Sequence, residues 1–326
     1  GRASPPAGGL PLRLYRRWVE ATSATEAGTS LALFRIALGL CVLWTLGSVV
    51  GSDTVDLLWV DSAHGGMKRL SGTWLVDALG GPVPSVVHGL VAAGMVCGLA
   101  LVVGIGGRLT ALLTLVVVRA VTGLNTEAAG SYDLLLANAL WLAVLGDTTA
   151  TLSVDARLRT GRWTSARPVG MWARYLVAFQ LVVMYASTGW QKLSAYWTPG
   201  GDFSALYWIL QQPGWQRIDM TWTAWVFPVT QLATAVTWVW EVTAPVLLLA
   251  VWAHDAPEGR IRRALVRWRV RDVYVVVGLV LHVSLLVLMN VGPFGPLSMA
   301  LYPALYAPDA FHRGFRRMVA RRPSGA

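Results

Sequence analysis

Eight apolar segments, separated by polar loops, run through almost the whole sequence. We expect helices at 31–50, 84–103, 109–124, 132–145, 171–190, 222–252, 273–291 and, in a shorter segment, 297–306. A helix that crosses the hydrocarbon core of a bilayer needs about 20 predominantly apolar residues. The pattern therefore predicts an all-α fold, a polytopic membrane helix bundle of about eight transmembrane helices.

The composition argues against a soluble protein. Hydrophobic residues make up 55% of the chain and charged residues 13%, whereas soluble domains carry roughly 25% charged residues. The two cysteines, Cys41 and Cys97, both lie inside apolar segments. We therefore expect no disulfide framework, and no ligand spacing in the sequence indicates a metal site.

Arginine is distributed unevenly between the loops. The loops 51–83, 125–131, 192–221 and 292–296 carry only Lys68, Arg69, Lys192 and Arg217, and the alternate segments carry the basic clusters, which include Arg174 and Arg271. Basic loops remain in the cytoplasm. We expect a multi-pass protein of the cell membrane, with both termini in the cytoplasm and Lys192 outside. This topology accounts for the net charge of +10, so the expected contact is membrane lipid and not nucleic acid.

Three regions follow from this division. Residues 1–29 are expected to form an N-terminal cytoplasmic segment with a disordered start, residues 30–306 the transmembrane domain, and residues 307–326 a basic cytoplasmic tail. The sequence contains no internal repeat, which argues against the inverted-repeat transporter folds.

Five ionisable residues inside the expected spans stand out, because a charge there is costly and marks a site or a partner. Arg35 lies near the cytoplasmic start of its span, so its side chain can snorkel to the surface. Arg119 and Asp133 lie near the outer ends of adjacent spans, where we expect an ion pair. Glu241 and His282 lie near the middle of their spans. Each is either a satisfied structural residue or part of a functional site.

Lys192 follows the fifth apolar segment and is one of two lysines among 27 basic residues. A lysine removed from water can act as a base near neutral pH, which an arginine cannot. The surrounding aromatic residues are Trp190, Tyr196, Trp197, Tyr207 and Trp208. They fit an apolar pocket and equally an interfacial belt in which Lys192 is an anchor, so the residues alone leave both interpretations open.

Several segments, in order along the chain, carry motifs of one family. They are SLALFRIALGL (30–40), GLALVVGIGGRLTALL (98–113), SYDLLLANALWLAVLGDTTATLSVDA (131–156) with Ser153 and Asp155, the spacing Q-x4-Y-x3-G-x2-K-L-x3-W from Gln180 to Trp197, Glu241, and LHVSLLVLMNVGPFG (281–295). They resemble the HTTM (horizontally transferred transmembrane) proteins, bacterial members of the vitamin K-dependent γ-glutamyl carboxylase superfamily.

The resemblance implies a role for Lys192, and the hypothesis built on it assigns roles to further residues. Lys192 matches the lysine that deprotonates vitamin K hydroquinone in the carboxylases, so it would be the base at an outward-facing site. Glu241 and His282 would tune it or relay protons. Tyr185, Trp190 and Trp197 would contact a reduced quinone of the vitamin K or menaquinone type. Four further polar residues would be structural: Arg35, Arg119, Asp133 and Asp155.

Two departures from the carboxylase pattern limit this expectation. Gly130 stands where the carboxylases carry a histidine that supports carboxylation, and the large extramembrane region that binds their peptide substrate has no counterpart here. We therefore expect quinol chemistry without peptide carboxylation. The alternative is a non-enzymatic membrane factor for the maturation or export of a secreted peptide, or for immunity to it. A DoxX-like quinone oxidoreductase subunit fits less well, because those proteins have four-helix cores.

Overall fold

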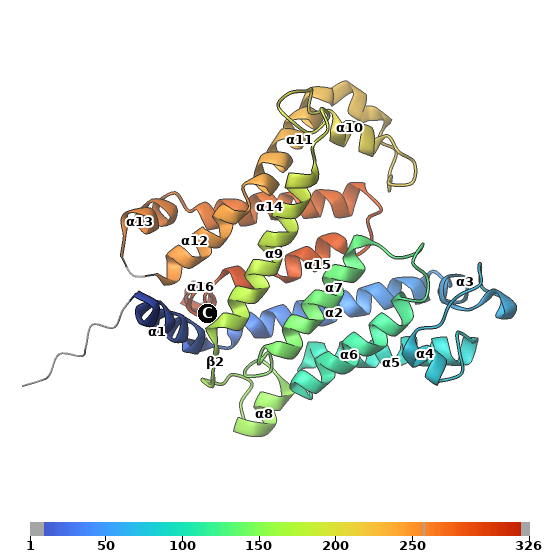
Figure 1. The fold of residues 1–326 in the computed structure, drawn as a ribbon, viewed down its shortest axis with the longest axis horizontal. Helices are drawn as coiled ribbons and strands as arrows, with labels where there is room; N and C mark the ends of the chain where they lie inside the picture. Colours follow the sequence, from blue (N-terminus) through green and yellow to red (C-terminus); the bar gives the residue numbers. More distant parts are fainter. Residues whose placement is uncertain (1–9, 257, 321–326) are drawn as a thin grey trace, which may run out of the picture.

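The computed structural model describes residues 10–256 and 258–320, and most of these residues are helical (Figure 1). The elements are α1 (Leu10–Ser23), β1 (Thr25–Ala27), α2 (Thr29–Gly51), α3 (Val55–Trp59), η1 (Ser62–His64), α4 (Trp74–Ala78), α5 (Pro84–Val103), α6 (Gly107–Thr122), α7 (Ser131–Leu145), α8 (Val154–Thr160), β2 (Pro168–Gly170), α9 (Met171–Gln191), α10 (Ala205–Leu210), η2 (Thr221–Val226), α11 (Phe227–Val242), α12 (Pro245–Asp255), α13 (Arg260–Arg267), α14 (Val270–Leu288), α15 (Phe294–Ala300), η3 (Tyr302–Leu305) and α16 (Pro308–Ala320). The start of the N-terminal segment, which we expect to be disordered, and the end of the basic tail lie outside the described residues.

Every expected apolar segment coincides with helix, which confirms the all-α prediction. Within the described part of the chain, α2, α5 and α14 are each long and apolar enough to cross a membrane, and α11 with α12 makes a fourth such span if the pair is counted as one. The two three-residue strands β1 and β2 pair in antiparallel fashion and form a two-stranded sheet. This sheet joins the segment before α2 to the segment before α9.

The sixth and eighth apolar segments differ from the expected single helices. The sixth is divided into η2, α11 and α12, and the axes of its two halves diverge by 58°. The break after Val242 is explained by Pro245, which has no backbone N–H and disrupts a continuing helix. The eighth is divided between the short helix α15 and the turn η3.

Small residues allow the first helices to pack closely. α2, α5, α6 and α7 follow one another as neighbouring helices. A Cβ atom at Gly39 would lie 2.8 Å from the backbone nitrogen of Val102 and 2.9 Å from the carbonyl oxygen of Gly98. Close backbone approach at small residues is typical of helix pairs in membranes, so glycine is required where α2 crosses α5.

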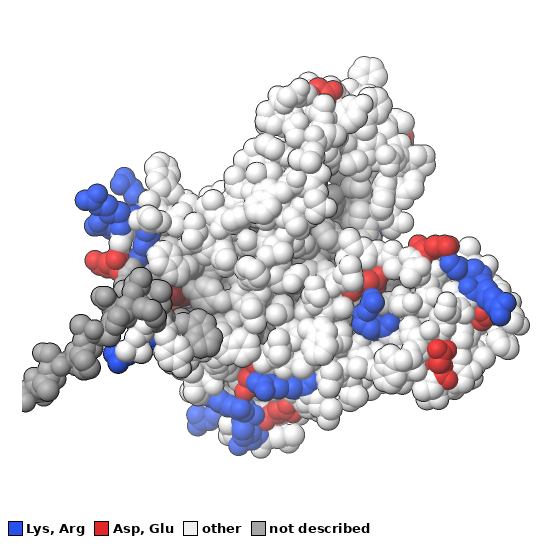
Figure 2. Space-filling view, in the orientation of Figure 1, with Lys and Arg blue, Asp and Glu red and all other residues white. Residues whose placement is uncertain are grey.

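The basic segments gather on one side of the molecule. In Figure 1, α1, α8, α13 and α16 lie toward one side, whereas α3, α4 and α10 lie away from it. Figure 2 shows Lys and Arg side chains near α13 and α8, and little charge over α9 and α11. The hydroxyl of Thr29 and Nε2 of His312 lie 3.0 Å apart and join the start of α2 to α16. Both ends of the described chain therefore lie on the same side.

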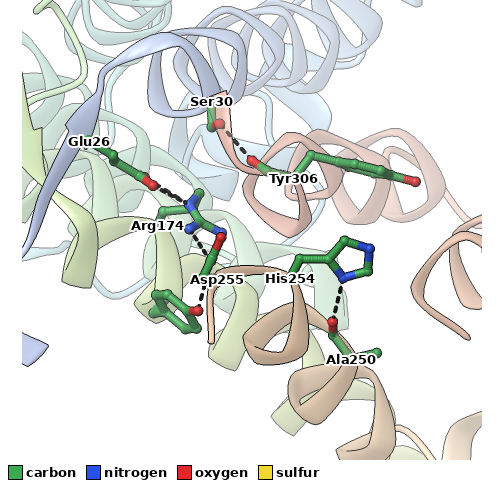
Figure 3. A network of polar contacts seen from close by, with 8 residues as sticks. Glu26, Ser30, Arg174, Ala250, His254, Asp255 and Tyr306 are labelled. Atoms are coloured by element: carbon green, nitrogen blue, oxygen red, sulfur yellow. Dashed lines mark hydrogen bonds and ion pairs between the residues drawn. The ribbon is translucent and has the colours of Figure 1, made fainter. Parts of the chain in front are cut away.

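Arg174, which the loop charges assign to a basic cluster, is buried at the start of α9 (Figure 3). Its Nε atom donates to both carboxylate oxygens of Glu26, at 2.8 and 3.0 Å, and its Nη2 atom donates to Asp255 at 2.6 Å. The hydroxyl of Tyr175 donates to the same Asp255 oxygen at 2.8 Å. This group, the Arg174 cluster, ties β1, α9 and α12 together, so its arginine is a packing residue.

Arg271 is a second basic residue whose expected loop position is corrected by the structure. Its side chain is 9% exposed, and its guanidinium lies 4.1 Å from the centroid of the Tyr306 ring. Such stacking is a common cation–π geometry for arginine. Arg271 therefore packs α14 against the segment that follows η3.

Arg35 does not snorkel to the surface as expected. It is fully buried, and its Nη2 atom donates to the carbonyl oxygen of Leu152 at 2.6 Å. Leu152 has a positive φ of 49°, a conformation that costs energy for a side-chain-bearing residue and persists only when its surroundings hold it. Arg35 thus anchors the turn that precedes α8, and Ser153 caps that helix by accepting from the Ala156 N–H at 2.9 Å.

The expected ion pair between Arg119 and Asp133 is absent from the described residues. Asp133 instead accepts from the backbone N–H of Gly130 at 2.8 Å, and so closes the first turn of α7. Asp155 has a comparable role, because its carboxylate accepts from the N–H of Gly106 at 3.0 Å in the turn between α5 and α6. These carboxylates satisfy backbone donors that the helix ends leave free.

Candidate functional site

Lys192 lies where the backbone leaves α9. It has φ −82° and ψ 76°, outside the helical region, and its N–H donates to the carbonyl oxygen of Gly189 at 3.2 Å. This change of direction turns its side chain toward α11, where the ammonium group forms an ion pair with Glu241. The ammonium also lies 4.2 Å from the ring centroid of Trp197. Both contacts stabilise a positive charge at this position.

Glycine at position 189 brings the two partners together. A Cβ atom there would lie 2.7 Å from the Cβ of Glu241 and 2.7 Å from the backbone nitrogen of Val242. Any larger residue would push α11 away from the end of α9. Gly189, the glycine of the Q-x4-Y-x3-G-x2-K-L-x3-W motif, therefore has a physical role. It lets the backbone that carries Glu241 approach the turn that carries Lys192.

The ion pair is largely shielded from solvent but is not sealed within the packed core. The Lys192 side chain is 18% exposed and that of Glu241 is 8% exposed. Both residues line a cavity of about 730 Å³, called the central cavity below. Its walls come from the start of α7, from α9, α11 and α14, and from the loop that contains Trp197. The pair therefore faces a space large enough for a small-molecule ring system.

Three buried polar side chains form a second group beside the central cavity. The hydroxyl of Tyr185 lies 2.7 Å from Nε2 of His282 and 3.0 Å from the hydroxyl of Tyr302. His282 is 1% exposed, and its Nδ1 atom has no hydrogen-bond partner among the described residues. Tyr185 and His282 both line the central cavity. The cavity wall thus carries the Lys192 ion pair and this network, and its smaller polar side chains are Ser131, Thr188, Thr237 and Asn290.

Two of the three aromatic residues expected to contact a quinone lie on the wall of the central cavity. Tyr185 and Trp197 line the central cavity. Trp190 does not: its ring is more than half exposed, and its indole N–H donates to the carbonyl oxygen of Val242 at 3.2 Å. At a helical rotation of about 100° per residue, position 190 points away from the face that Tyr185 shares with Gly189. Trp190 supports the contact of α9 with α11 from outside.

Several wall residues carry no sequence signal strong enough to single them out. Tyr132, Thr188 and Trp240 also line the central cavity, and Trp240 packs its ring 4.3 Å from that of Tyr185. Tyr302 contacts the site through its hydrogen bond to Tyr185 and through its ring, whose centroid lies 6.3 Å from that of His282. The clue for Tyr132 is its place in the S-Y-D motif, where the following aspartate caps the helix.

Gly130, the residue that departs from the carboxylase pattern, lies on the wall of the same cavity. A Cβ atom there would lie 2.6 Å from Cε1 of the Tyr132 ring. The ring therefore occupies the space beside Gly130 that a histidine side chain at this position would enter. The departure changes the surface of the candidate site itself.

The described residues contain no group of three His, Cys, Asp or Glu side chains that could hold a metal ion. The polar side chains on the wall of the central cavity can transfer protons and form hydrogen bonds. An ammonium–carboxylate pair and a tyrosine–histidine network are suited to both.

Comparison with known proteins adds one match. A family model described as the HTTM domain matches residues 24–309. No curated protein and no solved structure matches the chain. The matched range contains the whole central cavity, the Lys192–Glu241 pair and the Arg174 cluster.

Proposed function

Because this chain belongs to the HTTM domain family and is a membrane protein, we propose that it is an enzyme that deprotonates a lipid-soluble quinol in the central cavity. Lys192 and Glu241 act on a hydroxyl group of that quinol. The substrate class is a reduced quinone of the vitamin K or menaquinone type. The observation that supports this proposal is the position of the ion pair on the wall of a mostly apolar cavity.

The pair can accept one proton from a hydroxyl group. Lys192 hands its own proton to the Glu241 carboxylate and takes the proton of the substrate hydroxyl. The O–H bond of the substrate breaks and an O–H bond forms on Glu241, while Lys192 ends as an ammonium group facing the new oxyanion. The total charge is unchanged, and the oxyanion is stabilised by a neighbouring cation in a poorly solvated space.

This exchange requires lysine. An arginine holds its proton at any pH that proteins tolerate, so it can pair with Glu241 but cannot pass the proton on. Glutamate is the complementary requirement, because a glutamine at position 241 has no carboxylate to receive the proton. The pairing of these two residue types therefore fits proton transfer better than simple charge neutralisation.

The tyrosine–histidine network fits the second oxygen of a quinol. The hydroxyl of Tyr185 and the ring of His282 line the cavity, and they offer hydrogen-bond donors and acceptors on a rigid wall. We propose that this network orients the quinol ring whose hydroxyl group Lys192 deprotonates. Orientation of reacting groups contributes to rate without any chemical role.

Peptide carboxylation does not fit the cavity. Gly130 provides no side chain at the position where the carboxylases have a histidine, and the Tyr132 ring occupies the space beside it. We therefore propose that the enzyme forms the quinol anion and transfers no carboxyl group. Dioxygen then takes two electrons from the anion and, with the second hydroxyl proton and the proton held on Glu241, becomes hydrogen peroxide, which leaves the quinone.

A quinol-oxidation assay tests this function. Purified protein in nanodiscs would receive a naphthoquinol and dioxygen, and the wild type would be compared with Lys192→Ala and Lys192→Arg. We expect loss of at least about 99% of the rate in both variants, since general bases typically contribute 10²–10⁴-fold. Equal rates in all three proteins would show that Lys192 is not the base. The alternative, a non-enzymatic membrane factor for a secreted peptide, would then be favoured.

The membrane topology that serves this function is part of the proposal. We infer about eight crossings of the cell membrane, with both termini in the cytoplasm and Lys192 facing outside. The support is the gathering of basic segments at one side and the contact between Thr29 and His312. In a chain without Cys41 and Cys97, an impermeant thiol reagent applied outside should label Ser194→Cys and spare Thr160→Cys. The reverse pattern would contradict this orientation.

A further inference from the structure

A second cavity, of about 520 Å³, lies between α11 and α14 and is called the apolar groove below. No charged residue lines it. Its hydroxyl groups include those of Thr223 and Thr230, which donate to the carbonyl oxygens of Met220 and Phe227, each at 2.7 Å. With these hydroxyls engaged by the backbone, the wall offers a ligand mainly aliphatic and aromatic contact.

The apolar groove adjoins the central cavity. Five residues line both: Leu206, Thr237, Leu281, Leu285 and Met289. Thr237 lies one helical turn before Glu241 on α11, and Leu281 directly precedes His282 on α14. A chain lying in the groove therefore ends next to the two polar groups of the candidate site.

The outer rim of the groove belongs to the surface that a membrane would cover. Val229, Leu232 and Val236 on α11 are exposed, as are Val276 and Val280 on α14. α14 is one of the helices long and apolar enough to cross a bilayer. Figure 2 shows a surface almost free of charge over α11. The groove thus opens toward acyl chains, while the polar cavity lies behind it.

We propose that the apolar groove holds the hydrocarbon tail of the substrate, which enters sideways from the lipid between α11 and α14 while its head reaches Lys192. The inference rests on the proposed function and narrows the substrate class. The ligand is an amphiphile with a hydroxyl-bearing ring and a long tail, such as a polyisoprenoid quinol. A tailless quinol would occupy only the central cavity.

Matched substitutions separate the tail from the head. Val280→Trp and Ala233→Trp place an indole in the groove from its two walls, and Val283→Trp places one on the exposed face of α14 outside the groove lining. Affinity would be measured in nanodiscs for a naphthoquinol with a polyisoprenoid tail and for its tailless analogue, each per mole fraction of quinol in the lipid. This scale removes the difference in partitioning between the two ligands.

We expect both groove variants to weaken binding of the tailed quinol at least about tenfold, because an indole and the tail compete for one space. The same variants should change the affinity of the tailless quinol less than about twofold, and Val283→Trp should behave as wild type. Unchanged affinity for the tailed quinol in both groove variants would overturn the inference. So would equal weakening by Val283→Trp.

A second measurement guards against variants that do not fold and separates the two proposals. A tailed quinol with a diazirine at the end of its tail should label α11 and α14 at the groove in the wild-type protein. Labelling elsewhere overturns the groove inference and leaves the Lys192 chemistry standing. Efficient competition by a phospholipid with no quinol head would mean that the groove holds only membrane lipid. Failure of every quinol to bind the wild type would refute the proposed function itself.

Discussion

The two ends of α9 each carry a cation paired with carboxylate, but the two pairs differ in kind. At its start, Arg174 binds two carboxylates, Glu26 and Asp255, and its side chain is 1% exposed. Just after its end, Lys192 binds one carboxylate, Glu241, and is 18% exposed beside a cavity. One pair lies on the side of the basic segments, and the other lies near the loop that precedes α10.

The difference shows how the same charge pairing serves stability or chemistry. Arg174 is held by several hydrogen bonds and cannot lose its proton, so it fixes the relative positions of β1, α9 and α12. Lys192 has fewer partners, a residue type that exchanges its proton, and free space in front of it. Only the second arrangement lets a ligand change the protonation of the pair.

The largest expected effect is on stability, at the Arg174 end. Arg174→Met leaves Glu26 and Asp255 without their buried cation, and we expect a loss of about 3–5 kcal/mol in the free energy of unfolding. Thermal unfolding in detergent, followed by size-exclusion chromatography, measures it. The matched control is Arg167→Met, whose exposed pair with Asp147 spans 2.8 Å and should contribute less than about 1 kcal/mol. Equal losses in both variants would contradict a structural role for Arg174.

The next effect separates stability from binding at the Lys192 end. Lys192→Met should cost about 2 kcal/mol, because Glu241 loses its partner but keeps access to the cavity. Adding Glu241→Leu should restore most of this stability, since it removes the unpaired carboxylate. Neither variant should deprotonate a quinol. Activity in the double variant, measured by quinol oxidation, would show that the pair is merely structural.

A smaller effect comes from the glycine that brings α9 and α11 together. Gly189→Ala should destabilise the fold by about 1–3 kcal/mol, because its methyl group meets the backbone beside Glu241. It should also lower quinol turnover by moving Glu241 away from Lys192. Gly47→Ala is the control, because nothing lies within 4 Å of the added Cβ. If the two alanine variants melt at the same temperature, the close approach at Gly189 does not constrain the helices.

The smallest effect distinguishes the two neighbouring tryptophans. Trp190→Phe removes one hydrogen bond to Val242, which we expect to cost about 0.5–1.5 kcal/mol without changing quinol affinity. Trp197→Leu removes the ring beside the Lys192 ammonium and should weaken quinol binding severalfold. Titration of both variants with a quinol compares them. If only Trp190→Phe weakened quinol binding, Trp190 and not Trp197 would be the tryptophan that contacts the quinol.

The positions of the helices could be predicted from the sequence because apolar length and loop charge are local properties. The bend between α11 and α12 was missed, because residues 222–252 were expected to form one helix, although Pro245 favours a break there. Lys192 and Glu241 were both selected from the sequence, but their contact depends on how α9 and α11 pack, which no local pattern shows.

Other features depend on three-dimensional packing alone. Arg174 looked like a loop arginine, because charge counting cannot tell a buried residue with distant partners, Glu26 and Asp255, from a solvated one. Arg35 was misjudged for the same reason, since its partner Leu152 is far along the chain. The apolar groove has no sequence signature, because it is formed by the separation of two helices whose residues are ordinary for lipid contact.

The most direct test of the base proposal is the protonation state of a bound quinol. Absorbance spectra would be recorded without oxygen, at neutral pH, for a naphthoquinol bound to the wild-type protein and to Lys192→Arg. We predict the spectrum of the quinol anion in the wild type and that of the neutral quinol in the arginine variant. A neutral quinol in the wild type, or the same spectrum in both proteins, would contradict the account.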